Sequence, residues 1–213
     1  VIVGAGGASA AVDFGTILSG KRAAVVFCDP TRVSLSDLLL DANSGLTSAI
    51  EDAKRWPALM WGVALCNITS GPCEYWLPQM IEMRRAGRLP RNLALIASAA
   101  DDGARISVPG SVLRHLLPFE PQSRPCPITP AHAGAWPMAE SDRDRLKEAT
   151  GLLFDAEVDG SALKTMARMI SRTPPVIGLE QLRSVFVRQA GWQSACAKGA
   201  KHDFNRYFKD LED

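Results

Sequence analysis

The stretch VIVGAGG, residues 1–7, decides the fold because three apolar residues run directly into a series of glycines. Residues 8–21 then carry apolar side chains at helical spacing, and residues 22–28 (RAAVVFC) form a second apolar run. A strand that is apolar on both faces is typical of a buried parallel sheet. We therefore predict a strand, a turn, a helix and a second strand, which together begin a βαβ unit.

The same alternation continues along the chain. Residues 59–68 (LMWGVALCNI) and 92–99 (NLALIASA) are two further candidates for buried strands, and residues 72–88 between them suit an amphipathic helix. Residues 105–108 are a candidate for one more short strand. These elements predict an α/β fold with a Rossmann-like, mostly parallel sheet in a nucleotide-binding domain over residues 1–117.

The pattern changes after this domain. Residues 118–138 are rich in proline, which interrupts helices and central strands, so they predict an extended crossover. Beyond it we expect a helical C-terminal region over residues 139–213. The helical patterns there cover residues 140–153, 161–170, 179–190 and 193–211.

Composition limits the classes of function. The net charge is only +1 over 213 residues, so no overall field attracts nucleic acid or a membrane surface, and we expect neither as a partner. No apolar run approaches the ~20 residues that a membrane-spanning helix needs. Five cysteines without a CxxC pair, and only three histidines, predict a reduced cytoplasmic protein without a structural metal.

The glycine loop, residues 4–7, follows a strand and opens a helix, which is the context of a dinucleotide-type phosphate site. Gly4, Gly6 and Gly7 would let a phosphate approach the backbone, and the helix N-terminus would supply N–H donors. Asp29 ends the second strand, where an acidic residue can accept hydrogen bonds from ribose hydroxyls. The alternative interpretation is a tight turn with an incidental aspartate nearby.

The residues after Asp29 carry a resemblance to a known family. VIVGAGG followed by AVVFCDPTRVSLSDL, residues 24–38, resembles the ThiF/MoeB/HesA superfamily of ubiquitin-activating-type adenylating enzymes. More loosely, residues 63–71 and 92–108 are similar to later strands of that family, so the resemblance covers about half of the chain. It implies that the protein binds ATP, with or without magnesium, and adenylates the C-terminus of a ubiquitin-like or sulfur-carrier protein. The positions in register are Asp29, Val33, Ser36 and Leu38.

The resemblance also implies site residues, and this chain departs from the family at several of them. Asp37 stands where an asparagine is expected, Leu40 where an arginine is expected, and Ser70 where a magnesium-binding aspartate is expected. Lys54 is the sole lysine candidate in this region for a phosphate contact, or else a solvated surface charge. Cys126 in the crossover is the candidate for accepting an activated acyl group, or else an inert buried thiol.

The sequence therefore predicts a nucleotide-binding protein that adenylates, or in a degenerate form only binds, the C-terminus of a peptide or carrier protein. A homo- or hetero-oligomer is compatible with that role. Each missing charge removes about 2.7–4 kcal/mol of transition-state stabilisation, which favours the degenerate form. Two alternatives stay open. Residues 4–12 also resemble the nucleotide loop of shikimate-dehydrogenase-like oxidoreductases that use NADP, and the chain also fits a non-catalytic protein-recognition module.

One further stretch, residues 188–209, interleaves basic side chains with aromatic ones. Such mixtures can hold single-stranded nucleic acid. Phe204 and Phe208 are also spaced i and i+4, which suits a helix that packs onto a core. Because the chain is nearly neutral, we interpret this stretch as a packing or partner-contact segment.

Overall fold

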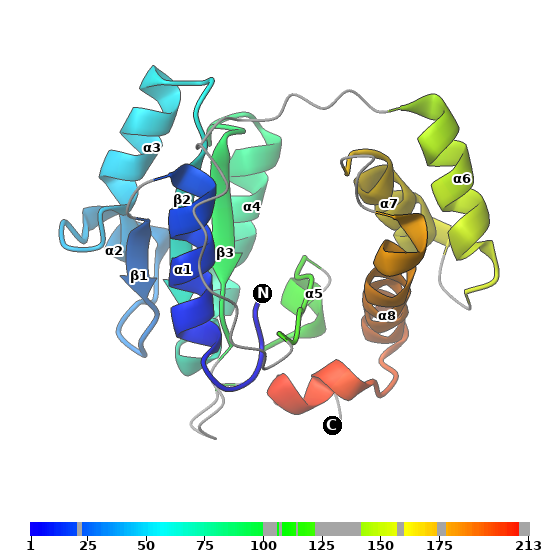
Figure 1. Cartoon of the computed structure of the whole chain (residues 1–213). Helices are drawn as coiled ribbons and strands as arrows, with labels where there is room; N and C mark the ends of the chain where they lie inside the picture. The colour runs from blue at the N-terminus through cyan, green and yellow to red at the C-terminus, as the bar shows by residue number, and fades with distance from the viewer. Residues whose placement is uncertain are drawn as a thin grey trace. The chain divides into compact units, whose positions relative to one another are not determined.

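The computed structural model describes residues 1–20, 23–99, 106, 108–113, 115–121, 142–156, 160–173 and 178–208. The chain forms two compact units, which are drawn in Figure 1. The first comprises Val1–Trp136 and Asn205–Asp210, and the second comprises Pro137–Phe204 and Leu211–Asp213.

The first unit is built on a parallel sheet of three strands in the order β1-β2-β3. Each strand lies inside an apolar run that predicted it, and every residue of β2 is buried, as expected of a central strand. The predicted parallel α/β sheet is therefore confirmed. The candidate strand over residues 105–108 lies partly outside the described residues. The strands are β1 (Ala24–Phe27), β2 (Trp61–Cys66) and β3 (Leu93–Ala97).

Residues 1–3 continue the sheet beyond β3. On one side the Ile2 amide donates to the carbonyl of Ala97 at 2.7 Å, and on the other side the Val3 amide donates to the carbonyl of Phe119 at 2.9 Å. Both pairings are parallel. Phe119 belongs to the stretch that was predicted as an extended crossover, so the start of that stretch pairs with the sheet instead.

This strand order differs from the Rossmann order. In a Rossmann sheet the strand after the first helix lies beside the first strand, whereas here β2 and β3 lie between residues 1–3 and β1. The first helix, α1 (Gly7–Ser19), explains the difference because it crosses the sheet in close contact with β2. A Cβ atom on Gly62 would overlap the backbone of Gly15, so only glycine allows this approach. The chain thus reaches the far edge of the sheet before β1 begins.

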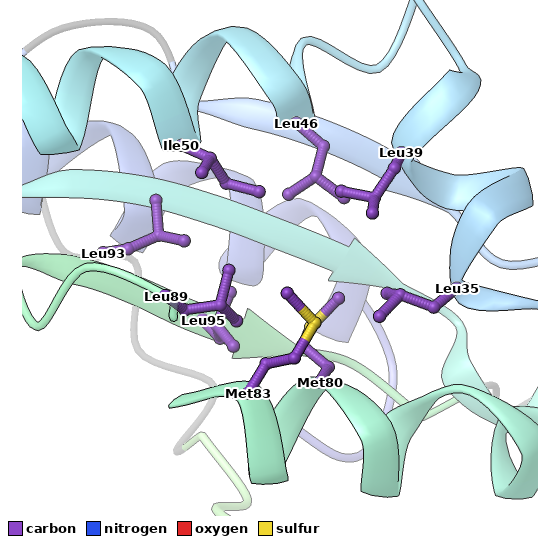
Figure 2. A pocket seen from close by; sticks show the side chains of 9 residues that line it. All are labelled: Leu35, Leu39, Leu46, Ile50, Met80, Met83, Leu89, Leu93 and Leu95. Atoms are coloured by element: carbon purple, nitrogen blue, oxygen red, sulfur yellow. The ribbon is translucent and has the colours of Figure 1, made fainter. Parts of the chain in front are cut away.

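Helices cover both faces of the sheet. The face that includes Ala64 and Ile96 packs against α1, which crosses the front of the sheet in Figure 1. Alternate strand residues point to the opposite face, where Leu93 and Leu95 meet side chains of three helices (Figure 2). Those helices are α2 (Leu35–Leu40), α3 (Leu46–Arg55) and α4 (Leu77–Arg85), and the shorter helices of this unit are η1 (Ile68–Ser70), η2 (Cys73–Tyr75) and α5 (Gly110–Leu113).

The second unit is helical. It contains α6 (Arg143–Phe154), α7 (Gly160–Ser171) and α8 (Leu179–Lys198). Asp142 begins α6 by accepting hydrogen bonds from the amides of Asp144 and Arg145. The largest fully buried side chains of the second unit are Leu153, Met166, Trp192 and Phe204. A short helix, η3 (Asp203–Tyr207), follows α8, and its residues from Asn205 onward belong to the first unit.

One prediction for this region was wrong. Residues 179–190 and 193–211 were expected to form two helices, but α8 runs without interruption through Gly191 and ends before Gly199, whose φ is 67°. A glycine inside a helix costs only about 1 kcal/mol relative to alanine. Complete burial of the neighbouring Trp192 more than offsets that cost. Within the described part of the chain, no helix has the length and apolar character to cross a bilayer.

Candidate functional site

The carboxyl edge of the sheet, where the strands end, contains a topological switch point. From residues 1–3 the chain runs through α1 toward β1, whereas from β3 it runs toward Phe119 on the other side of residues 1–3. Because crossovers are right-handed, connections in opposite directions leave on opposite faces. Open α/β sheets bind their ligands outside the carboxyl ends of the strands at such a point. The candidate site therefore surrounds the glycine loop and the end of β3.

The glycine loop has a backbone that needs glycine. Gly4 has φ of 94° and Gly6 has φ of 76°, both in the left-handed region, and the Gly7 amide closes the turn onto the Gly4 carbonyl at 3.0 Å. No described residue accepts a hydrogen bond from the amides of Ala8 and Ser9 in the first turn of α1. Gly6 is exposed and open on its Cβ side. The loop thus presents N–H donors and the positive end of a helix dipole, which together attract anions.

Asn67 and Ser98 lie at the ends of β2 and β3, under the loop. Ser98 is fully buried, and its hydroxyl accepts a hydrogen bond from the Asn67 amide at 2.9 Å. A Cβ atom on Gly7 would lie 3.5 Å from the Cβ of Ser98. Asn67, with φ of 58°, is the one non-glycine residue with a positive φ in the described part of the chain. Such conformations cluster at ligand sites, so Asn67 is a candidate binding residue.

Three polar residues form a hydrogen-bonded cluster beside Gly4. The Tyr207 hydroxyl lies 3.6 Å from the position that a Cβ on Gly4 would take. This hydroxyl donates to a carboxylate oxygen of Glu120 and accepts from the Arg206 guanidinium at 2.8 Å, and Arg206 also pairs with Glu120. Burial, followed by the bond to Glu120, raises the pKa of Tyr207. The phenol therefore stays protonated at neutral pH and can donate.

Asp29 and Ser70 lie close to one another but away from the glycine loop. Gly71, which follows Ser70, contacts the backbone of Asp29 so closely that a Cβ on it would overlap. Hydrogen bonds from the hydroxyl and the amide of Thr31 lower the pKa of Asp29. Three strand spacings of ~4.8 Å separate the ends of β1 and residues 1–3, or about 14 Å. The structure does not bring the predicted ribose ligand to the predicted phosphate loop.

The carboxylate of Asp37 is used inside the protein. It accepts hydrogen bonds from the amides of Ser34 and Val33, at 2.7 and 3.1 Å, and the Ser34 hydroxyl accepts from the Asp37 amide in return. This capping box begins α2, and the hydrogen bonds from Ser34 lower the pKa of Asp37. The local role of Asp37 needs no ligand.

Lys54 lies near the amino ends of the strands, whereas the glycine loop lies at their carboxyl ends. It is in the last turn of α3, whose end is fixed to Asn92, immediately before β3, through the carbonyl of Ala53. The ammonium of Lys54 lies 3.8 Å from the carboxylate of Glu51, and both side chains are largely exposed. A phosphate on the glycine loop would be one strand length away, roughly 16–20 Å. Cys126 lies outside the described residues.

Two cavities lined by described residues of the first unit lie away from the glycine loop. The space between α2, α3, α4 and the sheet, shown in Figure 2, holds only about 10 Å³ and is lined by leucine, isoleucine and methionine, so it is a packing gap without room for a ligand. A hollow of about 420 Å³ lies at the amino edge, lined by residues that include Ser48 and Asp52. No group of three or more potential metal ligands occurs among the described residues.

Four residues of the candidate site were not predicted from the sequence: Asn67, Ser98, Glu120 and Arg206. The first two end or directly follow predicted buried strands, where ligand-binding side chains are common, so a local signal existed. Glu120 and Arg206 carry no local signal because they meet only in the folded chain. Tyr207 belongs to the stretch that was predicted to pack or to contact a partner, but nothing local indicates that it contacts Gly4.

Comparisons with protein-family models, with curated proteins and with solved structures find no match to this chain.

Proposed function

We propose that this protein binds the phosphate groups of a nucleotide, with ATP as the first candidate, on the glycine loop. The observation that carries the proposal is the coincidence of two independent features. The loop presents the amides of Ala8 and Ser9 at the start of α1, and the strand connections place that same loop at the topological switch point. We also infer that the sheet is a doubly wound, Rossmann-like variant with its own strand order.

In this proposal the protein is a degenerate member of the adenylating class that binds without efficient adenylation. Lys54 and Asp29, which the sequence offered for the phosphates and the ribose, both lie away from the loop. Lys54 therefore supplies no positive charge at the phosphates, and an adenylation transition state there lacks that stabilisation. The C-terminus of a peptide or a ubiquitin-like carrier remains the proposed partner, on the strength of the resemblance alone.

The strand order argues against the oxidoreductase alternative. Binding of NADP on a dinucleotide-type fold uses the strand next to the glycine loop to contact the ribose. Here that neighbouring strand is β3, and the strand that ends at Asp29 lies at the far edge. The ATP interpretation loses the same ribose contact, so our expectation that ATP and AMP bind more tightly than NADP rests on the resemblance to the adenylating family.

Calorimetric titration with ATP, AMP and NADP tests the proposal when it includes a matched pair of variants. Gly6→Asp places a negative charge at an exposed, left-handed position of the loop, and Gly87→Asp makes the same change at another exposed, left-handed glycine, after α4. Both variants carry the same backbone cost. We expect Gly6→Asp to weaken ATP binding at least about tenfold through like-charge repulsion and Gly87→Asp to leave it unchanged.

Two results would contradict the proposal. If the unmodified protein binds none of the three ligands, the interpretation as a protein-recognition module takes its place. If both variants bind ATP as the unmodified protein does, the nucleotide binds elsewhere. Pyrophosphate exchange in the presence of a carrier peptide measures adenylation separately, and we expect no exchange above background.

A further inference from the structure

We propose that residues 205–208 act as a brace that holds the glycine loop in its phosphate-binding conformation, with Tyr207 as the positioning residue. The brace itself is a statement about the folded chain. Its effect on ligand affinity rests on the proposed function, and the experiment below separates the two.

The position of Tyr207 over the loop indicates that it supports the turn and does not obstruct the approach of a phosphate. In glycine loops of this kind the first glycine makes the tight turn and the second allows the backbone to approach the phosphate. Tyr207 lies against Gly4, the turn glycine, where its hydroxyl and Cε1 are 3.6 and 3.9 Å from the Cβ position. Gly6 is exposed, and nothing lies within 4 Å of its Cβ position. The contact therefore supports the turn and leaves the phosphate approach open.

The brace is anchored to the strand pairing that precedes the loop. Glu120 accepts hydrogen bonds from both Tyr207 and Arg206, and it directly follows Phe119. The amide of Phe119 donates to the carbonyl of Val1 at 2.7 Å, beside the strand that leads into Gly4. Tyr207 is only 6% exposed, so its ring packs as well as hydrogen-bonds. The hydrogen bonds among Tyr207, Arg206 and Glu120 hold the ring beside Gly4, so movement of the loop away from the ring would lose the packing at this glycine.

The anchor also explains why a segment so far along the chain belongs to the first unit. Residues up to Phe204 belong to the helical unit, whereas residues from Asn205 belong to the sheet-containing unit. The chain thus returns from the helical unit to the edge that carries the glycine loop. Because a single left-handed turn has few internal contacts, an external contact at Gly4 has a large influence on how often the turn opens.

Hydrogen exchange followed by mass spectrometry tests the brace on the full chain. Tyr207→Ala removes the ring and its hydroxyl, and Tyr75→Ala, at the other tyrosine, removes a ring that is 58% exposed. We expect the amides of Gly7 and Ala10, which donate to the carbonyls of Gly4 and Gly6, to exchange at least about tenfold faster in Tyr207→Ala and at an unchanged rate in Tyr75→Ala. Exchange in β2 reports global opening and should stay the same. ATP affinity should fall in parallel, also about tenfold.

A conservative variant keeps the proposal testable if Tyr207→Ala fails to fold. Tyr207→Phe keeps the ring on Gly4 and removes only the hydroxyl bonds to Glu120 and Arg206, so exchange at the loop should increase by about threefold, less than in the alanine variant. Unchanged exchange of the Gly7 and Ala10 amides in both variants would overturn the brace. Tighter ATP binding in either variant would overturn it as well, because the segment would then block the site. Faster exchange in a protein that binds no nucleotide at all would support the brace and contradict the proposed function.

Discussion

The amino and carboxyl edges of the sheet, where the strands begin and end, differ in how their polar groups are hydrogen-bonded. At the amino edge, the side-chain amide of Asn92 donates to the carbonyls of Ala53, Trp56 and Leu59, at 2.6 to 3.1 Å. The carbonyls at the end of α3 and in the loop that follows it are thus hydrogen-bonded within the protein. At the carboxyl edge, no described residue accepts from the amides of Ala8 and Ser9. Polar groups that are hydrogen-bonded within the protein, as at the amino edge, stabilise the fold. Amide donors without an acceptor among the described residues, as at the carboxyl edge, can bind a ligand. The comparison predicts that substitutions at the amino edge change folding and those at the carboxyl edge change binding.

Gly62→Ala, near the amino end of β2, should have the largest effect on stability. The new methyl group would overlap the backbone of Gly15 and force α1 away from the sheet, and we expect a loss of at least about 3 kcal/mol in the free energy of unfolding. Urea denaturation measures it. As a control, Gly151→Ala in α6 adds a methyl group in open space and should stabilise the helical unit by up to about 1 kcal/mol. Equal stability of Gly62→Ala and the unmodified protein would disprove the close approach.

Asn92→Ala should have the next largest effect and should sharpen the contrast between the edges. Asn92 is 4% exposed, and its removal leaves the carbonyl of Ala53 without this buried donor. We expect the free energy of unfolding to fall by about 2–3 kcal/mol, with ATP affinity unchanged. Urea denaturation and calorimetry on the same sample measure both quantities. The exposed Asn43→Ala is the matched control, and a change in affinity with unchanged stability in Asn92→Ala would break the comparison.

The smallest expected effect concerns the reactivity of the buried thiols of Cys28 and Cys73 at the carboxyl edge. Burial raises the pKa of Cys28 and of Cys73 to about 12, from a usual 9.0, so both remain protonated at pH 8. We expect iodoacetamide to modify them slowly in the folded protein and readily in urea, as mass spectrometry would show. Their effect on stability is constant below about pH 9 and is lost as the pH rises from about 9 toward 12, because the unfolded chain ionises first.

Cys126 provides the internal comparison for this labelling. The sequence predicts that it lies in an exposed loop, so it should react faster than Cys28 and Cys73 at pH 8. Equal rates for all three cysteines would argue that the core beneath the carboxyl edge opens readily, and would remove the contrast in burial.

The elements of the fold were largely predictable because their signals are local. Runs of apolar residues predicted β1, β2 and β3, and the positive φ of Gly4 and Gly6 agrees with a loop that only glycine forms easily. The end of α8 was not predictable from local pattern, because Gly191 and Gly199 have the same helix propensity. Only Gly199 adopts the left-handed conformation that ends the helix.

The amino-acid sequence by itself determined the three strands, the helices α1, α4, α6 and α7, and the turn at the glycine loop. Steric and hydrophobic preferences that act over a few residues suffice for that. Only the tertiary structure decided the order of the strands, which separates Asp29 from the loop. It also decided that Lys54 lies near the amino ends of the strands and that Tyr207 lies beside Gly4. These placements depend on contacts between residues far apart in the chain, such as Gly15 with Gly62, and no local pattern specifies which distant partner a segment will meet.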